Sequence, residues 1–550
     1  MIILRSLRSI LGFVVASAAW LPPLALGLGL FLDLAPNGRL RFSIFPAGVV
    51  LFDPATWEAA AHSLGLGVAV CLGAVLLGLP AGRVLLDLPG WAGVFARTGA
   101  ALGFAGGPFL CALGLRMGLE IAGVDRFAEV ISGALVPLGW SSDEAIVWSI
   151  VWAAHCLPAT SLIAWAAADA RTRIDPAWIE SARALGASRT RVERDLIRPN
   201  IRPAVSRACA GIFCWVVLDP GPPLVAGLSR TLADEAFRAL MRPGGATRAV
   251  VLTAVGLAMG IVARTLLSWW AGDDALAGSA RRPPERAGFS RRLLALFLGS
   301  AWLAIAAAPI LGLTGRLVAR FDSESLTDMM SLIYYDLLDR SFLETLIFSG
   351  VLAAVAALST AAIAAAAGWN QPAVGLADRA VRRLLELLAR IPAPAIGVGT
   401  AVVVAAASEM PGLRQSAAIV GLWWGVIAWR LPGGIREEEL GRDRDRADLV
   451  STTLAFGGSR RAADRAARRG RRRLGRLAAD GLRTAAALSP AVFLVNASDL
   501  SPLGPAILEL FDTPAKACAA GAIGYAIGLT ARACAGSEDP GPGRSRFPSP

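Results

Sequence analysis

The chain has 550 residues, of which 55% are hydrophobic and only 17% are charged, and its mean hydropathy is +0.56. Soluble domains carry about 25% charged residues, so this composition excludes an ordinary soluble domain and predicts a membrane protein. The net charge of +12 does not indicate nucleic-acid binding, because the arginines fall in alternate loops between apolar segments and not on one soluble face.

The apolar segments predict an all-α polytopic membrane protein. A helical span needs about 20 apolar residues, and by that criterion the chain offers about twelve candidates. The first, residues 11–32, also resembles a signal peptide with an A-x-A-like site at Ala16-Ser17-Ala18, but its apolar run is long enough to span. The other candidates are residues 63–79, 99–115, 145–168, 204–218, 249–270, 293–313, 343–367, 391–407, 417–429, 482–497 and 515–530.

The distribution of arginine predicts the orientation of these spans. If the N-terminus, with Arg5 and Arg8, is cytoplasmic, most basic residues fall in cytoplasmic loops, as the positive-inside rule expects. The C-terminus then lies in the cytoplasm too.

A polar segment rich in Asp, Arg and Pro divides the chain into two halves that have similar numbers of spans. Each half has a long basic loop between its fourth and fifth spans, which indicates an internal duplication. Six spans per half make the two repeats parallel, related by an axis along the membrane normal. The predicted organisation is a first half (1–270) with a basic loop at 171–202, a cytoplasmic linker (271–292), a second half (293–534) with a basic loop at 436–476, and a disordered tail (535–550).

The first basic loop reads as a helical hairpin. Asp175 is placed to cap a helix that begins at Pro176 and ends at Leu185, where Gly186 stops it. Such a hairpin between two spans is a rigid lever, because a partner that docks on it and moves will move both spans.

The second arm of that hairpin has two candidate caps, Ser188 and Thr190. Glu193 lies three residues beyond Thr190, as in a capping box, and Pro199 is expected to end this short helix at Arg198-Pro199.

The segment Glu180-Ser181-Ala182-Arg183-Ala184-Leu185-Gly186-Ala187-Ser188 resembles the E-A-A loop of binding-protein-dependent ABC permeases. The flanking segments 152–158 and 218–224 are similar to the family's fourth span and to the end of its fifth. In that family the loop docks onto the ATPase subunit. The resemblance assigns an ATPase-coupling role to Asp175, Pro176, Glu180, Ala182, Ala184, Leu185, Gly186, Ala187, Ser188 and Pro199.

The resemblance implies a type I ABC importer permease in a bacterial inner membrane, served by two cytoplasmic ABC ATPase subunits and a periplasmic solute-binding protein. Family members with both halves fused are associated with iron(III) or with small organic solutes such as thiamine or phosphonates. The alternative is a secondary transporter of about twelve spans driven by an ion gradient. Such a transporter needs carboxylates or histidine relays within its spans, and the sequence has few of them.

The second basic loop departs from this pattern. Phe456 and the Gly457-Gly458-Ser459 turn match the first loop, but Ser451 stands where the first loop has Glu180. Its many arginines would replace the motif by charge, or else form a basic helix at the membrane surface.

No enzymatic site is evident in the sequence. A phosphate-binding loop needs Gly-Lys-Ser/Thr, and the chain's only lysine, Lys516, follows Ala515. ATP is therefore expected on a partner subunit, with no cofactor held by this chain. The seven cysteines and two histidines show no metal spacing and no catalytic constellation, which argues against a membrane-embedded enzyme.

The candidate solute path has few ionisable residues. Asp219 and Asp499 fall at the outer ends of corresponding spans, where the family carries an acidic residue, although each carboxylate would equally well cap a helix or stay solvated. Pro158 is expected to kink the fourth span. His155 is expected to be hydrogen-bonded within helix packing.

Overall fold

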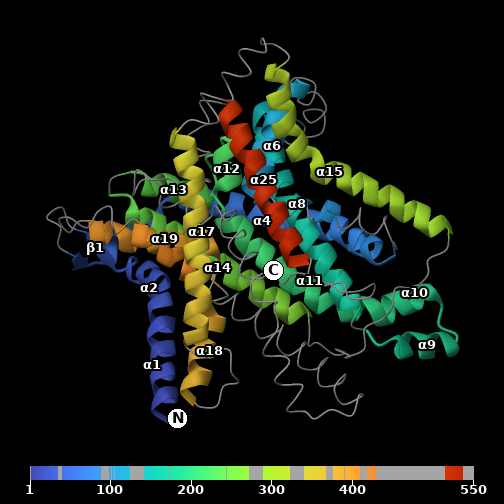
Figure 1. The fold of residues 1–550 in the computed structure, drawn as a ribbon, viewed down its shortest axis with the longest axis horizontal. Helices are drawn as coiled ribbons and strands as arrows, with labels where there is room; N and C mark the ends of the chain where they lie inside the picture. The colour runs from blue at the N-terminus through green and yellow to red at the C-terminus, as the bar shows by residue number, and fades with distance from the viewer. Residues whose placement is uncertain are drawn as a thin grey trace.

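The structure is a computed structural model of the chain (Figure 1). It describes residues 2–34, 40–87, 98–100, 102–103, 106–123, 141–172, 174–242, 244–271, 289–321, 340–366, 376–388, 391–408, 417, 419–421, 423–428 and 514–536. The predicted second coupling loop at 436–476, Asp499, most of the linker 271–292 and most of the tail lie outside the described residues.

The described part of the chain is almost entirely helical. Its elements in order are α1 Ile2–Ala19, α2 Leu21–Leu28, β1 Leu32–Leu34, β2 Leu40–Phe42, α3 Phe45–Phe52, α4 Pro54–Asp87, α6 Gly107–Ala122, α8 Ser142–Thr172, α9 Pro176–Ala184, α10 Arg189–Arg191, the π-helix η2 Val192–Ile197, α11 Arg198–Leu218, α12 Gly221–Ala226, α13 Leu232–Leu240, α14 Ala246–Ala271, α15 Phe289–Phe321, α17 Arg340–Ala366, α18 Leu376–Leu388, α19 Ala393–Ser408 and α25 Pro514–Gly536.

Five stretches of described helix are long and apolar enough to cross a membrane: Pro54–Arg83, Asp143–Thr172, Arg189–Leu218, Ala246–Ala271 and Ala295–Ala319. A bent pair, Ile10–Ala19 with Leu21–Leu28, makes a sixth if it is one span. These helices confirm the coarse prediction of a helical polytopic membrane protein. The finer prediction of twelve spans in two parallel repeats stays a prediction.

The first predicted span differs from the expected single helix. The chain bends by 42° between α1 and α2. Pro22 lacks the N–H that would bond to the Ala18 carbonyl, so the hydrogen-bond ladder of α1 is interrupted there and α2 begins as a separate helix. The Ala18 carbonyl instead accepts a hydrogen bond of 3.1 Å from the Trp424 indole. The run then ends in the short antiparallel pair β1–β2.

Helices α4, α8 and α11 form the centre of the first half. Leu66, Val70, Val151, Ile163 and Ile212 from these three helices are buried together. Small residues permit the close approach of α4 to α8: a Cβ added to Gly78 would lie 2.7 Å from the Ile163 Cβ. Small residues at helix crossings are typical of packing within membranes.

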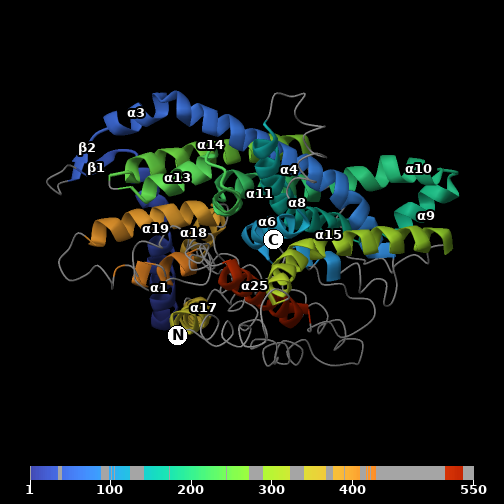
Figure 2. The same cartoon turned by 90° about the horizontal axis from the view of Figure 1, so that it is seen from above.

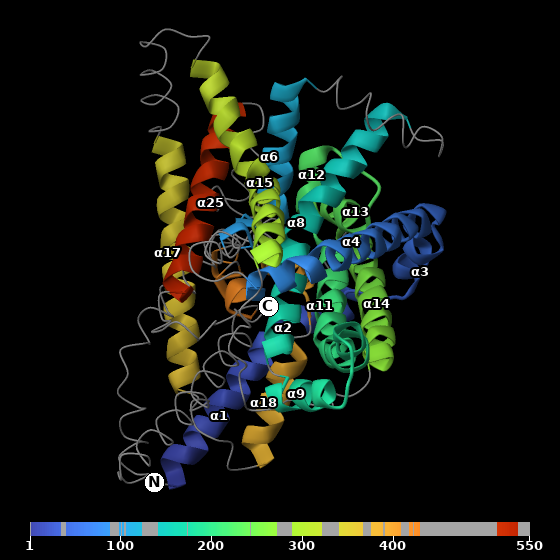
Figure 3. The ribbon, with the colours of Figure 1, turned by 90° about the vertical axis from the view of Figure 1, so that its right-hand side faces the viewer.

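Helices from both predicted halves pack against one another. Figure 3 shows α6, α15 and α25 side by side, and Leu113, Leu313 and Tyr525 from these helices share one buried cluster. The α6–α15 crossing is close, since a Cβ on Gly114 would overlap the Pro309 carbonyl oxygen.

The elements of the first half give the molecule two distinct ends. Figure 2 shows α9 and α10 at one end of the longest axis, and α3, α13 and the β1–β2 pair at the other. The helices α4, α11 and α14 join these ends, so a movement at the α9–α10 end can be carried along them.

Candidate functional site

The hairpin predicted in the first basic loop is present, and its first arm begins as expected. The Asp175 Oδ1 accepts a hydrogen bond from the Ala177 N–H at 3.0 Å, and Pro176 takes the first helical position. This is the N-terminal arrangement that Asp-Pro predicts, because proline has no N–H to leave unpaired.

The turn between the two arms requires glycine. Gly186 has φ of +82°, which side chains with a Cβ rarely adopt. The Ala187 N–H bonds to the Ala182 carbonyl and the Gly186 N–H bonds to the Arg183 carbonyl, at 3.0 and 2.9 Å. This pair of bonds is a Schellman motif and satisfies the carbonyls at the end of α9.

The second arm is capped by Ser188, whose Oγ accepts from the Arg191 N–H at 3.3 Å. The prediction that Arg198-Pro199 ends this arm was wrong. The chain passes through η2 directly into α11, and the Arg198 N–H bonds back five residues to the Glu193 carbonyl. This wider turn lets the helix pass the proline, which sits in the first turn of α11.

The two arms share a small core of their own. Ile174, Ile179, Val192 and Ile197 are all buried together, and Ala182, Ala187, Leu196 and Ile201 pack against them. Burial of four branched side chains holds the arms as one rigid unit.

Glu193 connects this unit to two spans. Its Oε1 and Oε2 accept hydrogen bonds from the Arg171 guanidinium at 3.1 and 2.7 Å. The Arg83 Nη2 lies 2.6 Å from its Oε1. Arg171 is in the last turn of α8 and Arg83 is near the end of α4, so one carboxylate ties the hairpin to both helices. The sequence pattern indicates Glu193 only as part of a capping box.

The outer surface of the hairpin carries an unpartnered apolar side chain. Leu185 is 89% exposed, more than any other large apolar residue in the described part of the chain. Glu180, Ala184 and Ser188 are exposed too, whereas Ala182 and Ala187 pack against the hairpin core. The predicted coupling residues therefore divide into an exposed surface and a supporting core.

The structure brings one candidate of the solute path together with a residue from another span. Asp219 is buried at the end of α11, where its Oδ1 accepts from the Gly221 N–H at 3.0 Å, so it is not solvated. Its Oδ2 lies 4.0 Å from the His155 Nε2 of α8. The His155 Nδ1 donates to the Val151 carbonyl at 2.9 Å, as helix packing predicts. Pro158 lies inside α8, which continues past it.

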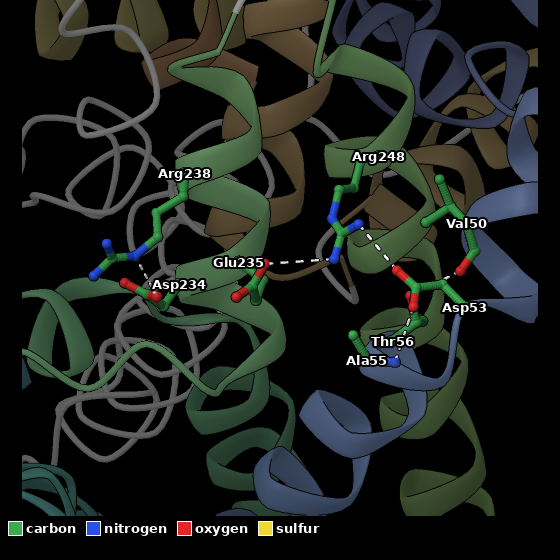
Figure 4. A network of polar contacts seen from close by, with 8 residues as sticks. All are labelled: Val50, Asp53, Ala55, Thr56, Asp234, Glu235, Arg238 and Arg248. Carbon is green, nitrogen blue, oxygen red and sulfur yellow. Dashed lines mark hydrogen bonds and ion pairs between the residues drawn. The ribbon is translucent and has the colours of Figure 1, made fainter.

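A polar network joins three elements at the opposite end of the molecule (Figure 4). Arg248 of α14 lies 3.1 Å from the Asp53 Oδ2, between α3 and α4, and 3.6 Å from the Glu235 Oε2 of α13. On α13, Arg238 pairs with Asp234 at 2.7 Å. Burial raises the pKa of Asp234 to about 6, although Arg238 acts in the opposite direction. No motif in the sequence pointed to this network.

No model of a known protein family matches the chain, and no curated protein matches it. In the part of the chain that the structure describes, no three histidine, cysteine or acidic residues are grouped as metal ligands would be. The hairpin and its connections to the helices are therefore the features that indicate a function.

Proposed function

We propose that the chain is the membrane-spanning permease subunit of an ATP-driven importer, and that a separate ATPase subunit docks on the α9–α10 hairpin. The observation that supports this most directly is the combination of an exposed leucine at the hairpin turn with a carboxylate that ties the hairpin to two spans. A surface that binds and a support that transmits force are the two requirements of a coupling element.

The exposed surface suits a protein partner. Burying Leu185 on docking would remove its apolar surface from water, at about 25 cal/mol per Å². Glu180 and Ser188 would supply polar contacts at the edge of such an interface. The supporting core of four buried branched residues limits the loss of conformational entropy when the partner binds.

The supporting connection would transmit the partner's movement. A force on the hairpin reaches α8 through Arg171, α4 through Arg83 and α11 through the unbroken η2–α11 helix. In the proposed mechanism, two ATPase subunits close on ATP, displace this hairpin and its counterpart, and open a path for a solute delivered by a periplasmic binding protein. ATP is bound by those subunits. Iron(III), thiamine or another small solute is the proposed cargo class.

The experiment is co-purification of the tagged chain with candidate ABC ATPase subunits, comparing wild type with Leu185→Asp. The matched control is Phe52→Asp, because Phe52 is also an exposed apolar residue, 84% exposed, but lies in α3 at the other end. We expect the complex to be lost with Leu185→Asp and kept with Phe52→Asp. Glu180→Ala combined with Gly186→Asp should also lose it. Failure of wild type to retain any ATPase would favour the gradient-driven transporter instead.

A further inference from the structure

His155 and Asp219 are two ionisable side chains from different helices that face each other inside the described part of the bundle, with the His155 Nε2 4.0 Å from the Asp219 Oδ2. Both side chains are buried, with exposed fractions of 0% and 7%. His155 comes from the middle of α8 and Asp219 from the corner where α11 turns into α12. Ionisable groups at such depth are costly to keep and are usually paired.

The hydrogen bonds of His155 fix which of its nitrogens carries a proton. A backbone carbonyl only accepts, so the Nδ1 that lies 2.9 Å from the Val151 oxygen must be the N–H donor. In a neutral imidazole the Nε2 is then an acceptor with a lone pair. That atom is buried and has no hydrogen-bond partner.

The atom facing this lone pair is also an acceptor. Asp219 uses its carboxyl oxygens to accept from the Gly221 N–H and from the Trp215 indole. Its Oδ2 lies 4.0 Å from the His155 Nε2, beyond hydrogen-bond range. Without a proton, two acceptors would face each other and the pair would leave one negative charge uncompensated in a buried place, which is strongly unfavourable.

We propose that His155 and Asp219 form a buried site that holds one proton at neutral pH and so links α8 to the α11–α12 corner. With that proton the pair has no net charge, whether the proton resides on the imidazole or on the carboxyl. The proton is therefore assigned to the pair and not to either residue alone. A metal ion is a poor occupant, because one nitrogen and one carboxylate oxygen fall short of the ligands it needs. This inference does not depend on the proposed importer function.

In the described part of the chain, several charged and titratable side chains on the helices that pack around the pair have partners of their own, and the Arg116 guanidinium of α6 donates to the Val225 carbonyl of α12. Helices α4, α6, α11 and α12 pack against α8. On α6, Arg116 pairs with Glu120 at 3.5 Å, and on α4 the Cys71 thiol donates to a carbonyl of α11. Among the described residues, no other charged side chain forms a hydrogen bond or ion pair with His155 or Asp219. Within the described part of the chain, the pair therefore balances its own charge.

The composition of the chain makes a direct test practical, because it contains only two histidines. In a His62→Gln background, ¹⁵N-histidine labelling reports His155 alone. Nitrogen NMR of the full-length chain in lipid bilayers at neutral pH then distinguishes an imidazolium from a neutral ring. Infrared spectra of the wild-type chain report whether Asp219 is a protonated acid. Asp219→Asn is the key variant, since its amide N–H can donate to Nε2 without an added proton.

We expect one of two results. Either His155 is an imidazolium that becomes neutral in Asp219→Asn, or it is neutral and an infrared acid band disappears in Asp219→Asn. In His155→Gln the carboxylate loses its titratable partner, so Asp219 should hold the proton itself and show the acid band; this variant serves if Asp219→Asn does not fold. The control, Asp234→Asn, changes another buried aspartate and should leave the His155 signal unchanged. A neutral ring with no acid band assignable to Asp219 would overturn the proposal.

Discussion

The Glu193 carboxylate of η2 accepts hydrogen bonds from both terminal nitrogens of Arg171, at 3.1 and 2.7 Å, and Arg171 lies at the end of α8. Two parallel hydrogen bonds fix direction as well as distance, so the hairpin cannot swing relative to α8 without breaking both. Arg83 adds a contact to α4 on the same carboxylate. The carboxylate therefore determines how the hairpin is held against the helices that enter the bundle.

Replacing this carboxylate should loosen the hairpin. We expect Glu193→Gln to lower the free energy of unfolding by about 1–2 kcal/mol, because it loses the charge of two partly buried ion pairs. Denaturation of the detergent-solubilised chain measures this, and proteolysis near Arg183 reports local opening. The control Asp195→Asn changes a more exposed carboxylate two residues away and should have little effect. Equal losses in both variants would contradict the special role of Glu193.

Substitution at Gly186 tests the backbone of the turn. No atom lies within 4 Å of an added Cβ, so crowding is excluded and only the φ of +82° opposes a side chain. We expect Gly186→Ala to cost about 1–2 kcal/mol and Gly186→Asn to cost less, because asparagine tolerates this conformation better. Gly211→Ala in α11 is the control, with equally open space but helical backbone, and should be neutral or mildly stabilising. Similar losses at both glycines would contradict the assignment of the turn.

Local features of the hairpin could be predicted from the sequence, but its connections could not. The cap at Asp175 and the stop at Gly186 depend on residues a few positions apart, where residue type limits the backbone. Glu193 instead bonds to Arg83, 110 positions earlier, and only the packing of α4 beside α8 brings them together. The spacing from Thr190 to Glu193 predicts a capping box, whereas in the structure the Glu193 carboxylate bonds to Arg83 and Arg171.

The first predicted span shows the same limit of a local pattern. A length criterion treats residues 11–32 as one helix because it counts apolar side chains and ignores missing backbone donors at Pro22. The pairing of His155 with Asp219 also lies beyond sequence reasoning, since 64 positions separate them and no motif relates them. Charged and polar partners in this chain are selected by helix packing, which an apolar pattern predicts only coarsely.

Asp234 should make stability depend on pH. Its folded-state pKa of about 6 lies above the unfolded value, so the folded chain binds a proton that the unfolded chain releases between about pH 4 and 6. Stability from this group is greatest below pH 4 and falls as the pH rises to 6. Asparagine does not titrate, so we expect the free energy of unfolding of Asp234→Asn, relative to that of wild type, to be about 2–3 kcal/mol higher at pH 7 than at pH 4. Denaturation curves recorded at pH 4 and pH 7 measure this difference. If the stability of both chains changes by the same amount between the two pH values, the prediction is wrong.

The close packing of α4 on α8 leaves no room for a side chain at Gly78. An added Cβ at Gly78 would lie 2.7 Å from the Ile163 Cβ and 2.9 Å from the Thr160 carbonyl oxygen, and a backbone atom cannot move aside alone. We expect Gly78→Ala to lower the free energy of unfolding by about 1–3 kcal/mol. Gly65→Ala, on the same helix with no atom within 4 Å, should leave it nearly unchanged. Arg83 of α4 and Arg171 of α8 both bond to Glu193. A displacement of α4 relative to α8 in Gly78→Ala should therefore weaken these bonds and raise protease cleavage in the hairpin. Loss of stability without that cleavage would mean that the hairpin is held by α8 and α11 alone.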